Sequence, residues 1–141
     1  MTAPEAVVID TSAVVAILKA EPNAGALSTA LDRATTRLIS AATMVELGMV
    51  IESSAPISGR ESIMRIIERC DVMPVDARAA VRAMEGWRSF GKGNHPAGLN
   101  FGDCFTYALA KEANLPILCI GNDFVRTDVA VVDLEMIGNE S

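Results

Sequence analysis

The 141-residue sequence predicts an α/β fold in which a parallel central sheet of four to five strands is flanked by helices on both faces. Short apolar runs alternate along the chain with longer stretches of helical periodicity, which is the pattern of a sheet covered on each side by helices. The residues are 50% hydrophobic and 21% charged, as is typical of a globular core. We therefore expect a single domain over residues 1–141, with its core at about residues 7–133.

Strands are predicted where short apolar or β-branched runs lie between turn-forming residues. In chain order, these runs are residues 7–9, 37–40, 72–75, 116–120 and 129–132. The first run is apolar on both faces, which is typical of a strand buried between two helical layers. Asp10 follows it directly and marks its carboxyl end.

Helices are predicted where apolar residues recur at helical spacing or where the composition favours a helix. In chain order, these segments are residues 12–18, 22–34, 43–52, 60–70, 77–90 and 101–113, followed by a helical turn at 123–126. The expected N-caps are Ser12, Asp76 and Asn100. Asp103 stands three residues after Asn100, in a capping-box arrangement. Residues 56–59 should break the chain between two helices, and residues 91–98 should form a flexible loop.

Charge and cysteine content exclude several classes of protein. The formal net charge of −6 argues against diffuse attraction to nucleic acid, so any such contact must be local. The three cysteines never form a C-x-x-C pair, which indicates neither a disulfide framework nor a zinc site. The apolar run 13–18 is far shorter than the roughly 20 residues of a membrane span. We expect a cytoplasmic protein with no membrane anchor.

Four acids stand in or beside apolar segments. Asp10 and Asp123 follow predicted strands, whereas Glu46 and Asp103 lie inside predicted helices. Because ligands of parallel α/β sheets bind beyond the carboxyl ends of the strands, the four acids should converge on one cleft. Taken singly, Asp10 and Asp123 could form turns, and Asp103 could complement a helix N-terminus. Glu46 lies among methionines and valines, where an unpaired charge would cost several kcal/mol.

A cluster of four carboxylates is most simply neutralised by a divalent metal ion. Carboxylate oxygens are hard ligands, and they select Mg²⁺ or Mn²⁺. The residues therefore predict a metal-dependent enzyme.

Other polar residues near the predicted cleft have weaker claims to a role. Thr11 and Ser12 could position a water or a phosphate at a helix N-terminus, although Ser12 is equally well explained as an N-cap. Among the cations, Lys92 and Arg126 lie nearest the acidic loops and are the better candidates for phosphate contact. His95, the only histidine, lies in the Gly-rich loop, where a solvated residue is more common than a catalytic base. Because there is also no second histidine and no cysteine in an electropositive helix start, Ser-His-Asp, Cys-His and two-histidine mechanisms are effectively excluded.

Four segments together resemble the PIN-domain ribonucleases, and most closely the VapC toxins of bacterial toxin–antitoxin pairs. They are Val-Ile-Asp-Thr-Ser-Ala at 8–13, Val-Glu at 45–46, Gly-Leu-Asn-Phe-Gly-Asp-Cys at 98–104 and Gly-Asn-Asp-Phe at 121–124. The resemblance extends from residue 7 to about residue 133. It implies that the family's acidic quartet is Asp10, Glu46, Asp103 and Asp123. Asp128 matches a further acid that many members carry.

The resemblance implies an endoribonuclease that depends on Mg²⁺ or Mn²⁺ and forms a homodimer. It also implies a cognate VapB-like antitoxin, a segment of which blocks the acidic cleft. We expect Asp10 and Asp103 to bind the metal directly, with Glu46 and Asp123 completing the site directly or through water. The metal would activate a water that hydrolyses the RNA phosphodiester bond. The sequence leaves open whether one ion or two are bound, and which RNA is cut.

Two alternatives belong to other functional classes. In a phosphohydrolase or a phosphoacceptor domain, Asp10 would be a nucleophile, but Ser12 stands where one such class needs a second acid. A noncatalytic antitoxin-binding module would have the same residues, and only an assay of RNA cleavage distinguishes it.

Overall fold

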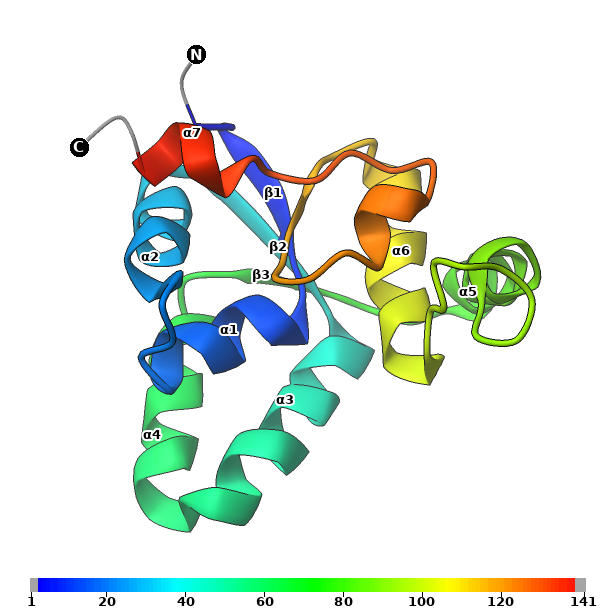
Figure 1. Ribbon diagram of the computed structural model, residues 1–141. Coiled ribbons are helices and arrows are strands. Elements are labelled where there is room, and N and C mark those ends of the chain that lie inside the picture. Colours follow the sequence, from blue (N-terminus) through cyan, green and yellow to red (C-terminus); the bar gives the residue numbers. More distant parts are fainter. Residues whose placement is uncertain (1–2, 139–141) are drawn as a thin grey trace.

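Figure 1 shows the computed structural model, which describes residues 3–138 and has helices on both faces of a four-stranded parallel sheet. The strands are β1 (Ala6–Ile9), β2 (Thr36–Ser40), β3 (Asp71–Met73) and β4 (Ile117–Leu118). Their order is β3-β2-β1-β4, so β2 and β3 extend the sheet on one side of β1 and β4 lies on the other. In parallel α/β sheets, ligands bind at the carboxyl ends of the two strands between which the strand order changes direction, here β1 and β4. The predicted fold class is confirmed.

Alternate residues of β1 face opposite helical layers. Val7 and Ile9 belong to one buried core, and Val8 belongs to a second. The helices of the first core are α1 (Thr11–Leu18), α2 (Ala24–Arg33), α3 (Ala41–Ser54), α4 (Pro56–Ile67) and α7 (Leu134–Gly138). Those of the second are α5 (Ala77–Phe90), α6 (Phe101–Ala113) and the 3-10 helix η1 (Phe124–Arg126). None of the helices described between residues 3 and 138 is long and apolar enough to cross a membrane.

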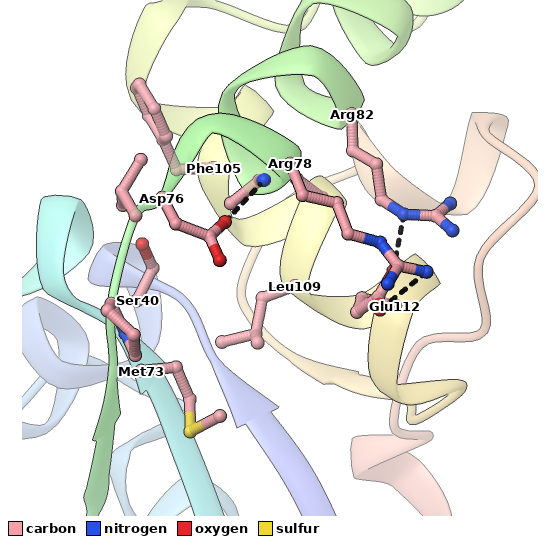
Figure 2. Close-up of a pocket in the computed structure, with 12 residues that line it drawn as sticks. Ser40, Met73, Asp76, Arg78, Arg82, Phe105, Leu109 and Glu112 are labelled. Atoms are coloured by element: carbon pink, nitrogen blue, oxygen red, sulfur yellow. Dashed lines mark hydrogen bonds and ion pairs between the residues drawn. The ribbon is translucent and has the colours of Figure 1, made fainter.

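Helix α5 packs closely against α6. A Cβ atom on Gly86 would lie 2.5 Å from Tyr107 Cδ1, so the helices touch where residue 86 has no side chain. Arg78 and Arg82 of α5 both reach Glu112 of α6, with N–O distances of 3.3 and 2.5 Å (Figure 2). Because these ion pairs are partly exposed, they contribute little to stability, and apolar packing between the two helices contributes more.

Some element predictions were wrong. Residues 129–132 do not form a fifth strand: Val131 makes one isolated bridge to Ile117, because β4 is only two residues long and offers no further ladder. The predicted break between two helices falls at Ala55 and not at residues 56–59. Those residues begin α4, since Pro56 occupies a first-turn position where its missing N–H costs nothing. Ser12 is not the N-cap of α1; that residue is Asp10.

Candidate active site

Asp10 is the most deeply buried of the four predicted acids, with 5% of its surface exposed. It directly follows β1 and caps α1, where its Oδ2 accepts a hydrogen bond from the Ser12 N–H at 3.1 Å. Its Oδ1 accepts from the Thr106 hydroxyl at 2.8 Å, across 96 positions of sequence. Two donors and the α1 N-terminus therefore hold this carboxylate in one orientation.

Glu46 lies in the second turn of α3 and faces the first turn of α6. Its Oε1 accepts a hydrogen bond from the Thr11 hydroxyl at 2.6 Å. A Cβ atom on Gly102 would lie 2.1 Å from Glu46 Oε2 and 2.7 Å from Glu46 Cδ. The Glu46 carboxylate therefore occupies the space that any other side chain at position 102 would need.

Asp103 forms the predicted capping box at the start of α6. Its N–H donates to Asn100 Oδ1 at 2.9 Å, and its Oδ2 accepts from the Asn100 N–H at 3.0 Å. The pKa of Asp103 is raised to about 6. Burial is the largest cause, opposed by the hydrogen bond from Asn100, and the charges of Asp10, Asp123 and Glu46 raise it further. The other three acids thus lie close enough to Asp103 to repel its negative charge.

Asp123 is the most open member of the group. It is exposed, precedes η1 and makes no capping hydrogen bond with its side chain. Burial, together with the charges of Asp10, Asp103 and Asp123, raises the pKa of the Cys119 thiol to about 12. A thiol with so high a pKa is unreactive, as expected for a cysteine inside an apolar segment. We define Asp10, Glu46, Asp103 and Asp123 as the acid cluster.

The remaining predicted site residues have structural partners or lie at the edge. The Thr11 hydroxyl orients Glu46, and Ser12 Oγ accepts from the Ile120 N–H at 3.0 Å, which links the segment after β4 to α1. Arg126 donates to the Pro96 carbonyl at 3.3 Å. Lys92 is exposed, and its side chain has no hydrogen bond or ion pair with any part of residues 3–138.

Asp128 and His95 make contacts that stabilise the fold. Asp128 accepts hydrogen bonds from the Tyr107 hydroxyl at 2.7 Å and from Lys111 Nζ at 2.9 Å. Both partners lie one to two turns beyond Asp103 along α6, which places Asp128 outside the acid cluster. His95 Nδ1 accepts from the Ala97 N–H at 3.0 Å, and its ring packs edge-on against Phe90.

Two residues of the site were not predicted from the sequence. Thr106 carries a local signal, because its position three residues after Asp103 places it on the same helical face. Gly102 has no sequence signal of its own, because only the fold brings it beside Glu46.

The oxygen donors of the acid cluster fit a hard divalent cation. No Lys or Arg within residues 3–138 forms an ion pair with any of the four acids. One oxygen of Asp103 and one of Glu46 accept no hydrogen bond from the described residues. The cluster is open, since no three His, Cys, Asp or Glu side chains in that range are gathered closely enough to hold one ion together. Like charges keep carboxylates apart, and a cation would draw them together.

This geometry argues against Asp10 as a nucleophile. A nucleophilic carboxylate must expose an oxygen to its substrate. Asp10 is almost fully buried, and both of its oxygens accept hydrogen bonds. Each oxygen keeps a second lone pair that a small metal ion could use, whereas a phosphoryl group needs more space, so the phosphohydrolase and phosphoacceptor alternatives are disfavoured.

The fold and the acid cluster define a class of protein, and comparison with known proteins identifies it. The chain belongs to the PIN-domain family, whose model matches residues 7–130. Its relatives within the family are VapC ribonucleases. It is 43% identical over 129 residues to ribonuclease VapC30 of Mycobacterium tuberculosis, covering 90% of this chain and 98% of the relative. It is 46% identical over 127 residues to ribonuclease VapC of Mycolicibacterium smegmatis, covering 89% and 98%.

Solved structures share the fold. A chain of a toxin–antitoxin complex from Klebsiella pneumoniae superposes with a TM-score of 0.70 at 15% identity, covering 89% of this chain and 96% of that chain. The resemblance to VapC toxins that the four sequence segments indicated is confirmed.

Proposed function

We propose that this protein is an endoribonuclease, the toxin of a toxin–antitoxin pair, and that it hydrolyses RNA phosphodiester bonds at the acid cluster. The observation that carries the proposal is that acids from distant segments lie around the start of α6 without a basic partner among the described residues. Thr106, one turn after Asp103, donates to Asp10, and the Glu46 carboxylate lies against Gly102. The relatives are named as ribonucleases, and the four acids stand in the segments that carry the family resemblance.

The cofactor in this proposal is Mg²⁺ or Mn²⁺. Asp10 and Asp103 would bind it directly, and Glu46 and Asp123 would complete the site directly or through water. When bound, such an ion polarises the scissile phosphate and activates a water for attack. The protein's own contribution is orientation: Thr106 fixes Asp10, Thr11 fixes Glu46, and Asn100 fixes Asp103.

The partner in this proposal is an antitoxin with a basic segment. The chain carries a formal net charge of −6, and its acid cluster is without cationic partners in the described residues. A basic segment would find complementary charge there and would exclude RNA and metal. The homodimer that the family resemblance implies is part of the same proposal.

Metal binding should stabilise the wild-type protein. An ion that binds only the folded state at 100 times its Kd adds about 2.7 kcal/mol, so Mg²⁺ or Mn²⁺ should raise the melting temperature by several degrees. Glu46→Gln should reduce that rise, because it removes one negative charge from the cluster. Thermal melting across a metal titration measures the effect, with Glu61→Gln on the surface of α4 as the matched control. A wild type that responds to neither metal would support the noncatalytic alternative.

Gly102→Ala should lower RNA cleavage by about 10- to 100-fold, the usual effect of displacing a group that orients a metal site. The new Cβ would meet the Glu46 carboxylate at 2.1 Å, so Glu46 must move away from Thr11. The fold should persist, because alanine favours a helix over glycine by about 0.5–1 kcal/mol. Rates on a labelled RNA and melting curves test this. Gly25→Ala is the control, since a Cβ there meets nothing within 4 Å. Full activity in Gly102→Ala would show that RNA cleavage does not depend on the position of the Glu46 carboxylate beside residue 102.

A further inference from the structure

Polar and charged side chains are rarely buried in this protein, and most of those that are buried form one chain of hydrogen bonds. Within residues 3–138 the buried ones are Asp10, Ser40, Thr43 and Thr106. The Thr106 hydroxyl donates to Asp10 Oδ1 at 2.8 Å, and the hydroxyl oxygens of Thr43 and Thr106 lie 3.2 Å apart. Each threonine has only 1% of its surface exposed, so bulk water does not reach either hydroxyl. We call Thr43, Thr106 and Asp10 the threonine relay.

The donors and acceptors of the three groups fix the direction of the threonine relay. An ionised carboxylate only accepts hydrogen bonds, so the Thr106 hydroxyl gives its single hydrogen to Asp10. The Thr106 oxygen can then only accept from Thr43, which makes Thr43 the donor of the second bond. Because hydrogen bonds in a chain polarise one another, the bond to Asp10 is stronger when Thr43 donates to Thr106.

The threonine relay joins the elements that carry three members of the acid cluster. Thr43 lies on α3, one turn before Glu46, and Thr106 lies on α6, one turn after Asp103. Both helices pass close to the carboxyl end of β1, where Asp10 stands (Figure 1). Packing alone needs neither hydroxyl, because valine has the shape of threonine and brings no polar atom into the core. The effect of the hydroxyls on the Asp10 carboxylate explains their place.

We propose that Thr43 is a positioning residue of the acid cluster, which acts on Asp10 through Thr106. Since Thr43 is buried, it contacts neither the metal nor the RNA of the proposed function. By donating to the Thr106 oxygen, it keeps the Thr106 hydrogen turned toward Asp10 Oδ1 and so fixes the direction in which this carboxylate presents its remaining lone pairs. The inference rests on the proposed function, because it adds a residue to the same site.

The affinity for Mn²⁺, measured from the electron paramagnetic resonance signal of the free ion, separates the hydroxyl of Thr43 from its shape. Thr43→Val keeps the shape and removes the hydrogen bond, so it should weaken Mn²⁺ binding about fivefold, the usual effect of one hydrogen bond on an equilibrium. Thr43→Ser keeps the hydroxyl and should bind Mn²⁺ nearly as tightly as the wild type. Thr35→Val is the control, because the Thr35 hydroxyl donates to the Glu5 carbonyl at the amino end of the sheet.

A double-mutant cycle tests whether Thr43 acts through Thr106. Thr106→Val removes a direct donor to Asp10 and should weaken Mn²⁺ binding by about 10- to 100-fold. Adding Thr43→Val to Thr106→Val should weaken binding no further, because the threonine relay is already broken. Additive losses from the two substitutions would show that Thr43 does not act through Thr106.

Nuclear magnetic resonance in EDTA tests the threonine relay without metal. The hydroxyl protons of Thr43 and Thr106 are shielded from water, so the wild type should give two slowly exchanging signals that lie close together in space. Thr43→Val should remove the first signal and move the second upfield, because the bond from Thr106 to Asp10 weakens. If Thr43→Val does not fold, the wild-type spectrum is sufficient, since rapid exchange of either hydroxyl proton with water would overturn the relay.

Two results with the Thr43 variants would overturn the positioning role. Wild-type Mn²⁺ affinity in Thr43→Val would show that the hydroxyl does not act on the site. Equal losses in Thr43→Ser and Thr43→Val would show that the shape of threonine matters and its hydrogen bond does not. RNA cleavage with Mg²⁺ is measured separately. A wild type that neither binds Mn²⁺ nor cleaves RNA contradicts the proposed function, whereas an active wild type with an unaffected Thr43→Val contradicts this inference alone.

Discussion

Asp103→Asn should lower RNA cleavage by more than about 100-fold while the protein stays folded. Removing a residue that only orients a metal ligand already lowers metal affinity or activity by about 10- to 100-fold. Asp103 is proposed as a direct ligand, so its loss should cost more. The fold should persist because the asparagine carbonyl can still accept the hydrogen bond from the Asn100 N–H that closes the capping box. In EDTA the melting temperature should rise by a few degrees, because one of four mutually repelling charges is gone.

The matched control is Asp76→Asn. Asp76 also caps a helix, accepting from the Ala79 N–H at 2.9 Å, but it lies at the start of α5 and outside the acid cluster. This variant should cleave RNA at the wild-type rate and should gain no stability in EDTA. An active Asp103→Asn would refute the assignment of Asp103, and an unfolded one would show that the residue is structural.

The raised pKa of Asp103 predicts how the free energy of unfolding depends on pH in metal-free buffer. Burial is the main reason that the pKa of Asp103 rises from an ordinary 3.8 to about 6 in the folded protein. Between these two values the folded state binds more protons than the unfolded state, so the free energy of unfolding should decrease as pH rises. Above about pH 6 the decrease should level off. Urea unfolding in EDTA from about pH 4 to about pH 8 measures the slope, which Asp103→Asn should reduce. An equal slope in the two proteins would contradict this interpretation.

The parts of the site that sequence could predict are those set by neighbouring residues. The capping box of Asn100 and Asp103 depends on a three-residue spacing, and the bounds of α5 and α6 follow from local caps and apolar periodicity. The position of Asp10 at the carboxyl end of β1 follows from the short apolar run before it. The convergence of the acids was inferred from the general topology of parallel α/β sheets.

Contacts between distant segments could not be predicted in this way. Thr106 reaches Asp10 across 96 positions and Thr11 reaches Glu46 across 35, so no local pattern marks either pair. The prediction of a fifth strand was wrong for the same reason, because strand pairing joins segments that are distant in the sequence. Residues 129–132 have a suitable composition, but pairing depends on the length of β4, which ends after Leu118.

The products of cleavage distinguish the proposed mechanism from metal-independent cleavage. That route uses the RNA 2′-hydroxyl as nucleophile and needs a general base and a general acid near neutral pH. His95 is the only histidine, and its Nδ1 accepts a hydrogen bond from the Ala97 N–H in the loop before α6. Attack by water instead should leave a 5′-phosphate and a 3′-hydroxyl, with no cyclic product. A single 2′-deoxy substitution at the scissile nucleotide should then still be cut, more slowly where recognition uses that hydroxyl.

The central claim is that the acid cluster hydrolyses RNA with a divalent metal, and the chemistry of the cut ends tests it most directly. Purified protein is incubated with a defined RNA in Mg²⁺ or in EDTA, and the product ends are determined by mass spectrometry. We expect 5′-phosphate and 3′-hydroxyl ends in Mg²⁺ and intact RNA in EDTA. A 2′,3′-cyclic phosphate product, or cleavage that persists in EDTA and is blocked by the 2′-deoxy substitution, would contradict the claim.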